Sequence, residues 1–247
     1  MKLNELIAFA QTVAPFGTAE EWDNVGLLVG GGFAEVTRVL LALDITPAVV
    51  REAHEKGAQL IISHHPVIFR PIGRLDPDSA EYLLARYGIA ALCLHTNLDR
   101  AAHGVNTALG KALRLQNTKL YPEEFLLVGE TERSFTAEEF AAFVKERLRA
   151  PSVRYTDGRV TRVAVSSGGG GEGVELCAKY GCDAFVTGEL KHHQYLYAVD
   201  HGVAAFDAGH FSTEDVVIPP LRELLQTRFP HEEFLVSEVC ACPYKAL

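Results

Sequence analysis

The segment AQLIISHHPVIF, residues 58–69, combines two features that recur along this chain. Its apolar run, which ends at Ser63, is typical of a buried strand, and a polar pair, His64 and His65, begins where the run stops. Runs of this kind alternate with helix-like segments, which predicts parallel strands joined by right-handed crossovers. Ligand sites in such α/β folds lie beyond the carboxyl ends of the strands. The segment therefore predicts both the fold class and the edge at which a site lies.

Two further segments repeat this pattern of an apolar run followed by polar side chains. IAALCLHTNLD, residues 89–99, places His95, Asn97 and Asp99 after a strand. GVAAFDAGHFSTED, residues 202–215, places His210 and Glu214 after another. Three strand ends that carry imidazole and carboxylate groups predict one convergent metal site.

The candidate ligands form a mixed nitrogen and oxygen set. Such a set favours zinc, iron, manganese, nickel or cobalt over calcium or magnesium. Five side chains exceed what one tetrahedral ion needs, so we expect two divalent metal ions that share a carboxylate. His95 is a candidate ligand or general acid–base. The five candidate ligands are His64, His65, Asp99, His210 and Glu214.

Each of these residues also has a structural interpretation, which the sequence leaves open. His64 and His65 can be hydrogen-bonded histidines at the start of a loop. Asn97 and Asp99 favour a tight turn, and Glu214 can stabilise the start of a helix. Under these structural interpretations, the three segments need not lie close together in the fold.

Two more clusters offer candidate polar groups. TGELKHHQ, residues 187–194, carries Glu189 and His193 four positions apart, either facing the site or on an exposed helix surface. We take His193, like His95, as a candidate proton-transfer residue. Gly168–Gly173 contains a G-x-G-x-x-G pattern, and with Lys191 it is a candidate phosphate-binding element. The pattern lacks the ending of a P-loop, so a flexible turn is the alternative.

Composition excludes several classes of protein. The 247 residues carry a formal net charge of −9 without a Lys/Arg-rich run, which argues against a nucleic-acid partner. The five cysteines show no disulfide spacing and are expected to be reduced thiols, although Cys240 and Cys242 form a C-x-C pair. We find no signal peptide and no run long enough to span a bilayer, so we expect no membrane partner and a cytoplasmic location.

The pattern predicts two interlinked α/β domains with mixed sheets flanked by helices. The polar segment Leu115–Glu124, which contains Pro122, is the expected internal boundary. We place a metal-binding α/β domain at 1–124 plus 205–247 and a second α/β domain at 125–204. A capping box at Thr136 and Glu139 predicts a helix start. A long helix is expected over Ser212–Arg228, with Ser212 as N-cap and a kink or break at Pro219 and Pro220.

The sequence resembles the Nif-three-like family, whose members are often labelled GTP cyclohydrolase 1 type 2 homologues. The motifs WDNVGLLVG, SHHPVIF, HTNLD, TGELKHH and GHFSTE carry the resemblance and follow the family's order. The resemblance implies a two-domain α/β fold and a ring-shaped homohexamer with inward-facing dinuclear metal centres. It also implies the same metal ligands: His64, His65, Asp99, His210 and Glu214.

Three functions follow as hypotheses. The first is a metal-dependent hydrolase of a nucleotide or another small polar substrate, such as the guanine ring of GTP, with His95 or His193 moving protons. The second is a non-enzymatic scaffold that stores, delivers or senses metal ions. The third is a dinucleotide-dependent enzyme that uses the Gly168 loop, although we expect no such cofactor.

Overall fold

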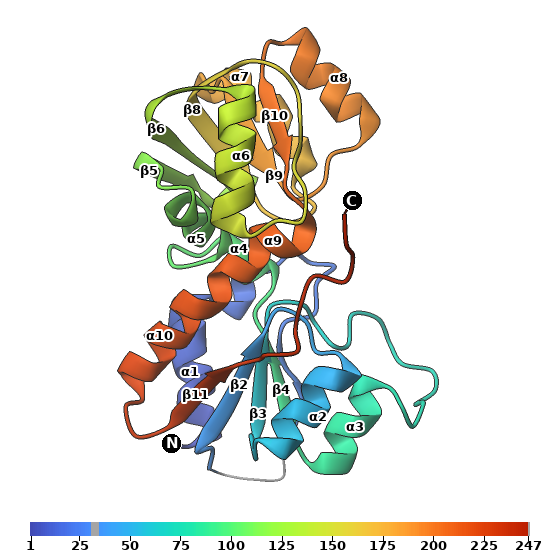
Figure 1. Cartoon of the computed structure of the whole chain (residues 1–247). Coiled ribbons are helices and arrows are strands. Elements are labelled where there is room, and N and C mark those ends of the chain that lie inside the picture. The colour runs from blue at the N-terminus through green and yellow to red at the C-terminus, as the bar shows by residue number, and fades with distance from the viewer. Residues whose placement is uncertain (31–34, 247) are drawn as a thin grey trace. The chain divides into compact units, whose positions relative to one another are not determined.

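The computed structural model describes residues 1–30 and 35–246, and the chain divides into two compact units (Figure 1). The first unit comprises residues 1–101 and 218–241, and the second comprises residues 102–217 and 242–247. Residues 31–34 and Leu247, which ends the predicted 205–247 segment, lie outside the described residues. Each unit has a mixed sheet flanked by helices, so the predicted fold class is confirmed. In the described part of the chain, every helix is too short or too polar to cross a membrane.

The first unit contains, among its described residues, a five-stranded sheet in the order β1-β4-β3-β2-β11. Strands β2, β3, β4 and β11 run parallel, and β1 pairs antiparallel with β4 at one edge. The strands are β1 (Gly26–Val29), β2 (Arg38–Ala42), β3 (Leu60–Ser63), β4 (Ala90–Cys93) and β11 (Glu233–Val236). The helices are α1 (Leu3–Val13), η1 (Phe16–Thr18), α2 (Pro47–Glu55), α3 (Ala80–Tyr87), α4 (Thr96–Asp99) and α10 (Ile218–Arg228).

Helices α2 and α3 lie side by side against this sheet (Figure 1). The Thr46 hydroxyl accepts a hydrogen bond from the Val49 amide, and Pro47 occupies the first turn, where its missing N–H costs nothing. Ser79 caps α3 in the same way, and Gly88 ends that helix in the left-handed conformation. The apolar sides of both helices pack with alternate strand residues such as Leu40. The capping residues therefore set where both crossover helices, α2 and α3, begin, and Gly88 sets where α3 ends.

The second unit contains a six-stranded sheet, again counted over described residues, in the order β5-β6-β8-β9-β10-β7. The central strands β8, β9 and β10 are parallel, and the other pairs are antiparallel. The strands are β5 (Gln116–Tyr121), β6 (Leu126–Thr136), β7 (Arg154–Tyr155), β8 (Arg159–Ser166), β9 (Ala184–Thr187) and β10 (Ala204–Asp207). The helices are α5 (Val105–Ala112), η2 (Pro122–Glu124), α6 (Ala137–Leu148), η3 (Gly171–Leu176), α7 (Cys177–Tyr180), α8 (His192–Asp200), α9 (His210–Glu214) and η4 (Asp215–Val217).

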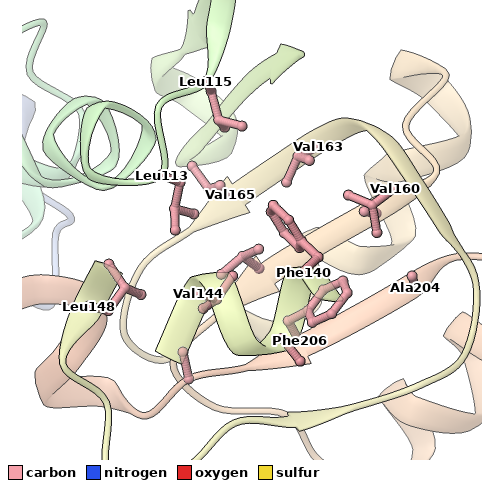
Figure 2. Packing of buried hydrophobic residues seen from close by; sticks show 14 of the residues in the cluster. Leu113, Leu115, Phe140, Val144, Leu148, Val160, Val163, Val165, Ala204 and Phe206 are labelled. Atoms are coloured by element: carbon pink, nitrogen blue, oxygen red, sulfur yellow. The ribbon is translucent and has the colours of Figure 1, made fainter. Parts of the chain in front are cut away.

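Side chains of the central strands alternate between two hydrophobic clusters in this unit. One cluster joins Val163, Val186 and Phe206 to helix α6, and Figure 2 shows Phe140 of that helix at its centre. The other joins Ala164 and Phe185 to η3, α7 and α8. Helix α6 begins at the predicted capping box of Thr136 and Glu139, which is confirmed. The sheet is therefore covered on both faces, as parallel strands require.

The domain boundaries differ from the predicted ones. The polar segment expected to separate the domains contains strand β5, which pairs antiparallel with β6. Its side chains are mostly exposed, so it carries little hydrophobic signal. Strand β10 likewise pairs with β9. Residues 102–124 and 205–217 therefore group with the second unit, because backbone pairing ties them to its sheet.

The predicted long helix over Ser212–Arg228 is divided into three pieces, α9, η4 and α10. The predicted break is confirmed, and Pro219 and Pro220 lie in the first turn of α10, where they displace no helical hydrogen bond. Ser212 is not the N-cap. Helix α9 begins at His210 after Gly209, whose φ of 87° favours glycine.

The Phe140→Ala variant should test the core of the second unit. Phe140 is fully buried and contacts Phe135 and Phe206 edge-on. Removing its ring should lower the free energy of unfolding by about 3–5 kcal/mol in a urea titration. Phe143→Ala, on the partly exposed side of the same helix, is the control and should cost clearly less. Equal losses would contradict the assigned core.

Glu52 in α2 ties down the segment that follows β11. Its carboxylate, 7% exposed, accepts hydrogen bonds from the Ser237 hydroxyl (2.5 Å) and the Glu238 amide (2.8 Å). Lys56 donates a third at 2.8 Å. Burial alone would raise the pKa of Glu52, but these hydrogen bonds outweigh it and lower the pKa below the ordinary value of 4.5.

Glu52→Gln should therefore lower the free energy of unfolding at pH 7 by about 1.5–3 kcal/mol. A depressed folded-state pKa stabilises the protein above the unfolded value of 4.5, and this contribution is lost as the pH falls through the folded pKa. In denaturant titrations, the difference in unfolding free energy between Glu52→Gln and the parent chain should shrink as the pH falls below 4.5. The exposed Glu55→Gln is the control. A difference that stays constant from pH 7 to about 3 would argue against this role.

Candidate metal centre

In the first unit, the strand register aligns the carboxyl ends of neighbouring strands, where the polar residues lie. Ala42 pairs with Ser63, and Ser63 pairs with Cys93, in parallel ladders. The residues two positions beyond these partners are Asp44, His65 and His95. Parallel strands in register end at the same edge, so these side chains emerge together with His64.

His64 and His65 both use Nδ1 for a hydrogen bond to an oxygen. His64 Nδ1 lies 2.9 Å from the Leu94 carbonyl oxygen, and His65 Nδ1 lies 2.7 Å from Asp44 Oδ1. A carbonyl or an ionised carboxylate can only accept, so Nδ1 carries the proton and the lone pair of the neutral ring is on Nε2. This arrangement is the one that orients metal-binding histidines in proteins.

His95 is held in the same manner by Asp23. Its Nδ1 lies 2.8 Å from Asp23 Oδ1, while Asp23 Oδ2 accepts from the Thr96 amide and hydroxyl. Burial would raise the pKa of Asp23, but the hydrogen bonds from His95 and Thr96 outweigh it and lower the pKa to about 2. One ligating atom from each of His64, His65 and His95 lies within 4.8 Å of the others. Three imidazoles therefore converge within this unit.

Asp99 lies on the short helix α4 instead of the tight turn that its composition suggests. Its Oδ1 is 3.7 Å from His64 Nε2, which places it with the histidines. Asn97 is fully buried and has a structural role. Its Oδ1 accepts from the His95 amide at 2.9 Å, and its Nδ2 donates to the Ala14 carbonyl at 2.8 Å.

The parallel strands of the second unit are aligned in the same way. Ser166 pairs with Thr187, and Thr187 pairs with Asp207, in parallel ladders. The chain then continues to Gly168, to Glu189 and, after Gly209, to His210. These residues therefore also meet at one strand edge.

His210 lies between two carboxylates. Its Nδ1 is 2.8 Å from Glu189 Oε1, and its Nε2 is 3.0 Å from Glu214 Oε2. The Glu214 side chain is only 6% exposed. If Nδ1 donates to Glu189, the Nε2 lone pair faces an anionic oxygen, which requires a positive charge near that nitrogen. A proton on the ring or a bound cation supplies it.

Glycines make room for this pair of side chains. A Cβ on Gly168 would lie 1.9 Å from Glu214 Oε1 and 3.0 Å from His210 Nε2. A Cβ on Gly188 would lie 2.7 Å from His210 Cα. The start of α9 therefore packs directly on backbone where any larger residue would displace it.

Three amides of the glycine loop donate hydrogen bonds within the protein. The amide of Gly168 donates to the Thr213 hydroxyl at 3.1 Å, and that of Gly170 donates to the Ser167 carbonyl at 3.1 Å. The amide of Gly173 donates to the Gly170 carbonyl at 2.9 Å. These amides therefore bond to groups of the protein itself. The missing side chain of Gly168 leaves room for His210 and Glu214.

Other predicted candidates are not members of the clusters found among the described residues. His193 is exposed on α8, and within the described residues its side chain makes no hydrogen bond or ion pair. Cys240 and Cys242 are partly exposed and form no disulfide with any described cysteine. Burial raises the pKa of the Cys93 thiol well above its ordinary value, which suits a packing role.

Sequence reasoning missed Asp23 and Asp44. Asp44 follows the apolar strand β2, so the strand-end pattern that selected His65 could have selected it too. Asp23 lies in a loop before β1, and only the fold brings it to His95. Both act through the histidines that they orient.

The fold and these clusters define a two-unit α/β protein with candidate metal-binding residues. The sequence matches the Duf34/NIF3 (NGG1p interacting factor 3) family over residues 1–243, and the chain belongs to that family. The resemblance drawn from its motifs is thereby confirmed.

Individual relatives agree with this assignment. A Clostridium acetobutylicum protein named GTP cyclohydrolase 1 type 2 homolog is 32% identical, over 99% of this chain and 98% of the relative. The crystal structure of Staphylococcus aureus protein SA1388 superposes with a TM-score of 0.93 at 32% identity, over 100% of this chain and 99% of that one. The structure of reduced HcgD from Methanocaldococcus jannaschii superposes with a TM-score of 0.80 at 29% identity, over 96% and 98% of the two chains.

Gly168→Ala should disturb Glu214 and His210 selectively. The added methyl would overlap the Glu214 carboxylate, and the φ of 54° disfavours alanine. We expect the free energy of unfolding to fall by about 1–3 kcal/mol. Metal retention after dialysis, measured by elemental analysis, should fall as well.

Gly169→Ala is the matched control, because nothing lies within 4 Å of its Cβ position. It should leave both quantities near those of the parent chain. If the two variants behave alike, the close approach of Gly168 to Glu214 has no consequence for the site.

Proposed function

We propose that this protein binds two divalent metal ions and uses them to hydrolyse a nucleotide or another small polar substrate. The metal ligands in this proposal are His64, His65, Asp99, His210 and Glu214. The observation that carries it is the hydrogen bonding of the histidines: in His64, His65 and His210, Nδ1 is held by an oxygen, which leaves Nε2 as the coordinating nitrogen.

The donor set fits such ions. Three imidazole nitrogens and two carboxylates suit zinc, iron, manganese, nickel or cobalt. Five ligands exceed one tetrahedral shell, and a carboxylate can bridge two cations. His64, His65 and Asp99 belong to the first unit, and His210 and Glu214 belong to the second.

The chemistry of hydrolysis would be divided between the ions and the side chains. The two ions would act as Lewis acids and activate a water molecule. His95 would move the proton, because its Nδ1 donates to Asp23 and its Nε2 is then the nitrogen that accepts. Asp23 would orient the ring and stabilise its charged form. We assign this step to His95 in preference to His193, which is exposed on α8.

The substrate class comes from the relatives. Several are named GTP cyclohydrolase 1 type 2 homolog, which favours a nucleotide. The homohexamer implied by the resemblance belongs to the same proposal. A scaffold that only stores or delivers metal would need the same ligands but no oriented proton-transfer residue, and the His95–Asp23 pair favours the hydrolase.

Substitution of His64 or Glu214 should test the proposed dinuclear site. After reconstitution with zinc or manganese, elemental analysis of the parent chain should find two ions per chain. His64→Ala and Glu214→Gln should each weaken the binding of both ions. The affinity should fall by more than the roughly 10- to 100-fold that removal of an outer-shell partner costs. Hydrolysis of GTP by the loaded protein should fall with metal content.

His231→Ala, a surface histidine in the first unit, is the control and should change neither quantity. Retention of one full ion by each ligand variant would indicate two independent mononuclear sites and refute the dinuclear proposal. A loaded protein that leaves nucleotides unchanged but passes its metal to an acceptor would support the scaffold function instead.

A further inference from the structure

We propose that Trp22 and Phe69 form an aromatic face that binds the planar ring of a heteroaromatic substrate next to His95. This inference rests on the proposed function, because it assumes that chemistry occurs at the histidine cluster of the first unit. It goes further by naming the residues that would hold the substrate and the part of the substrate that they hold.

Trp22, Phe69 and His95 form a triangle of rings. The ring centroids of Trp22 and Phe69 are 5.9 Å apart, and each lies 6.4 Å from that of His95. The planes meet at 67°, 78° and 89°, so the three rings face one another edge-on. His95 in turn lies 5.1 Å from His64 and 5.6 Å from His65, measured between centroids. The aromatic pair therefore adjoins the candidate metal ligands directly.

The two aromatic residues are exposed although they are large and apolar. Trp22 is 60% exposed and Phe69 is 45% exposed. Single exposed apolar residues are common and need no explanation. Two exposed rings in contact, on the border of a polar cluster, form the mixed surface that small-molecule sites use.

Both rings are attached to residues that fix the local backbone. Asp23, next to Trp22, accepts hydrogen bonds from His95 and Thr96. Asn24 donates from Nδ2 to the carbonyl of Ile68, the residue before Phe69, at 2.6 Å. The tripeptide Trp22–Asn24 is thereby tied both to His95 and to the Phe69 segment. An exposed tryptophan held in this way is preorganised, so that ligand binding orders little additional chain.

The chemistry of the two rings indicates which part of a substrate binds here. Trp22 and Phe69 offer exposed apolar π-faces and carry no charge that would pair with a phosphate group. A planar heteroaromatic ring gains stacking and apolar contact with them. The geometry therefore points to the base of a nucleoside as the group that lies on this surface.

Fluorescence of the metal-loaded protein should report binding, because Trp22 is the single tryptophan of the chain. Guanosine, which has the ring but no phosphate, should quench this emission in a saturable manner. Ribose, which lacks the ring, should not. Absence of quenching by guanosine in protein that holds two ions per chain would overturn the inference while leaving the metal centre intact.

Substitution should then separate the aromatic face from the metal site. In equilibrium dialysis, Trp22→Leu and Phe69→Leu should each weaken guanosine binding about 5-fold or more, the lower end of the effect of a base–aromatic stack. Their metal content should match the parent chain. Tyr155→Leu, an exposed aromatic of the second unit, is the control and should bind guanosine normally.

Unchanged guanosine affinity in both leucine variants would refute the aromatic face. If, in addition, the variants changed the molecular mass by light scattering, the two rings would be part of a subunit interface. Failure of the parent chain to retain metal is a different result, which would refute the proposed function itself.

Discussion

In-register parallel pairing is the constraint on which the candidate site depends. In each unit three neighbouring parallel strands align residue by residue, so their carboxyl ends lie side by side at one edge of the sheet. The positions two residues beyond the paired strand ends are Asp44, His65 and His95 in one unit, and Gly168, Glu189 and Gly209 in the other. A slip of one residue in any strand would turn these side chains to the opposite face. The apolar packing on both faces of the strands therefore determines where the polar groups lie.

The close packing of the second unit shows how this register is converted into a site. The chain after each parallel strand must turn within a few residues, and His210 begins its helix immediately after Gly209. Gly168 and Gly188 have no side chain, so Glu214 and His210 lie against their backbone. Glu189 then orients the ring from the other side. Side chains of different strand ends are thus held by backbone contacts, which are less adaptable than side-chain contacts.

Much of this fold could be predicted from sequence because its signals are local. Apolar runs such as Leu60–Ser63 and the cap at Thr136 depend on neighbouring residues alone. Strand β5 could not be predicted, because its exposed side chains carry no apolar pattern and its pairing with β6 is a tertiary property. The same reason explains why the two compact units have other bounds than the predicted domains.

The candidate site divides in the same way. The imidazoles and carboxylates at strand ends could be identified by residue type and position. Their partners could not, because the contact of Asp23 with His95 spans 72 residues of chain. The glycine loop allowed two interpretations, since a glycine can admit a ligand phosphate or the protein's own side chain. Only the folded structure shows that Glu214 lies against Gly168.

The balance of charge gives the carboxylates a second consequence. In the first unit three aspartates lie beside histidines, and in the second unit two glutamates flank His210. His64 is fully buried, so water screens the charges beside it incompletely. A divalent cation held among these carboxylates would interact with them more strongly than a monovalent one. A cation bound by the folded chain alone would add its binding free energy to the stability of the fold. The arrangement that orients the imidazoles would then also couple the binding of such a cation to folding.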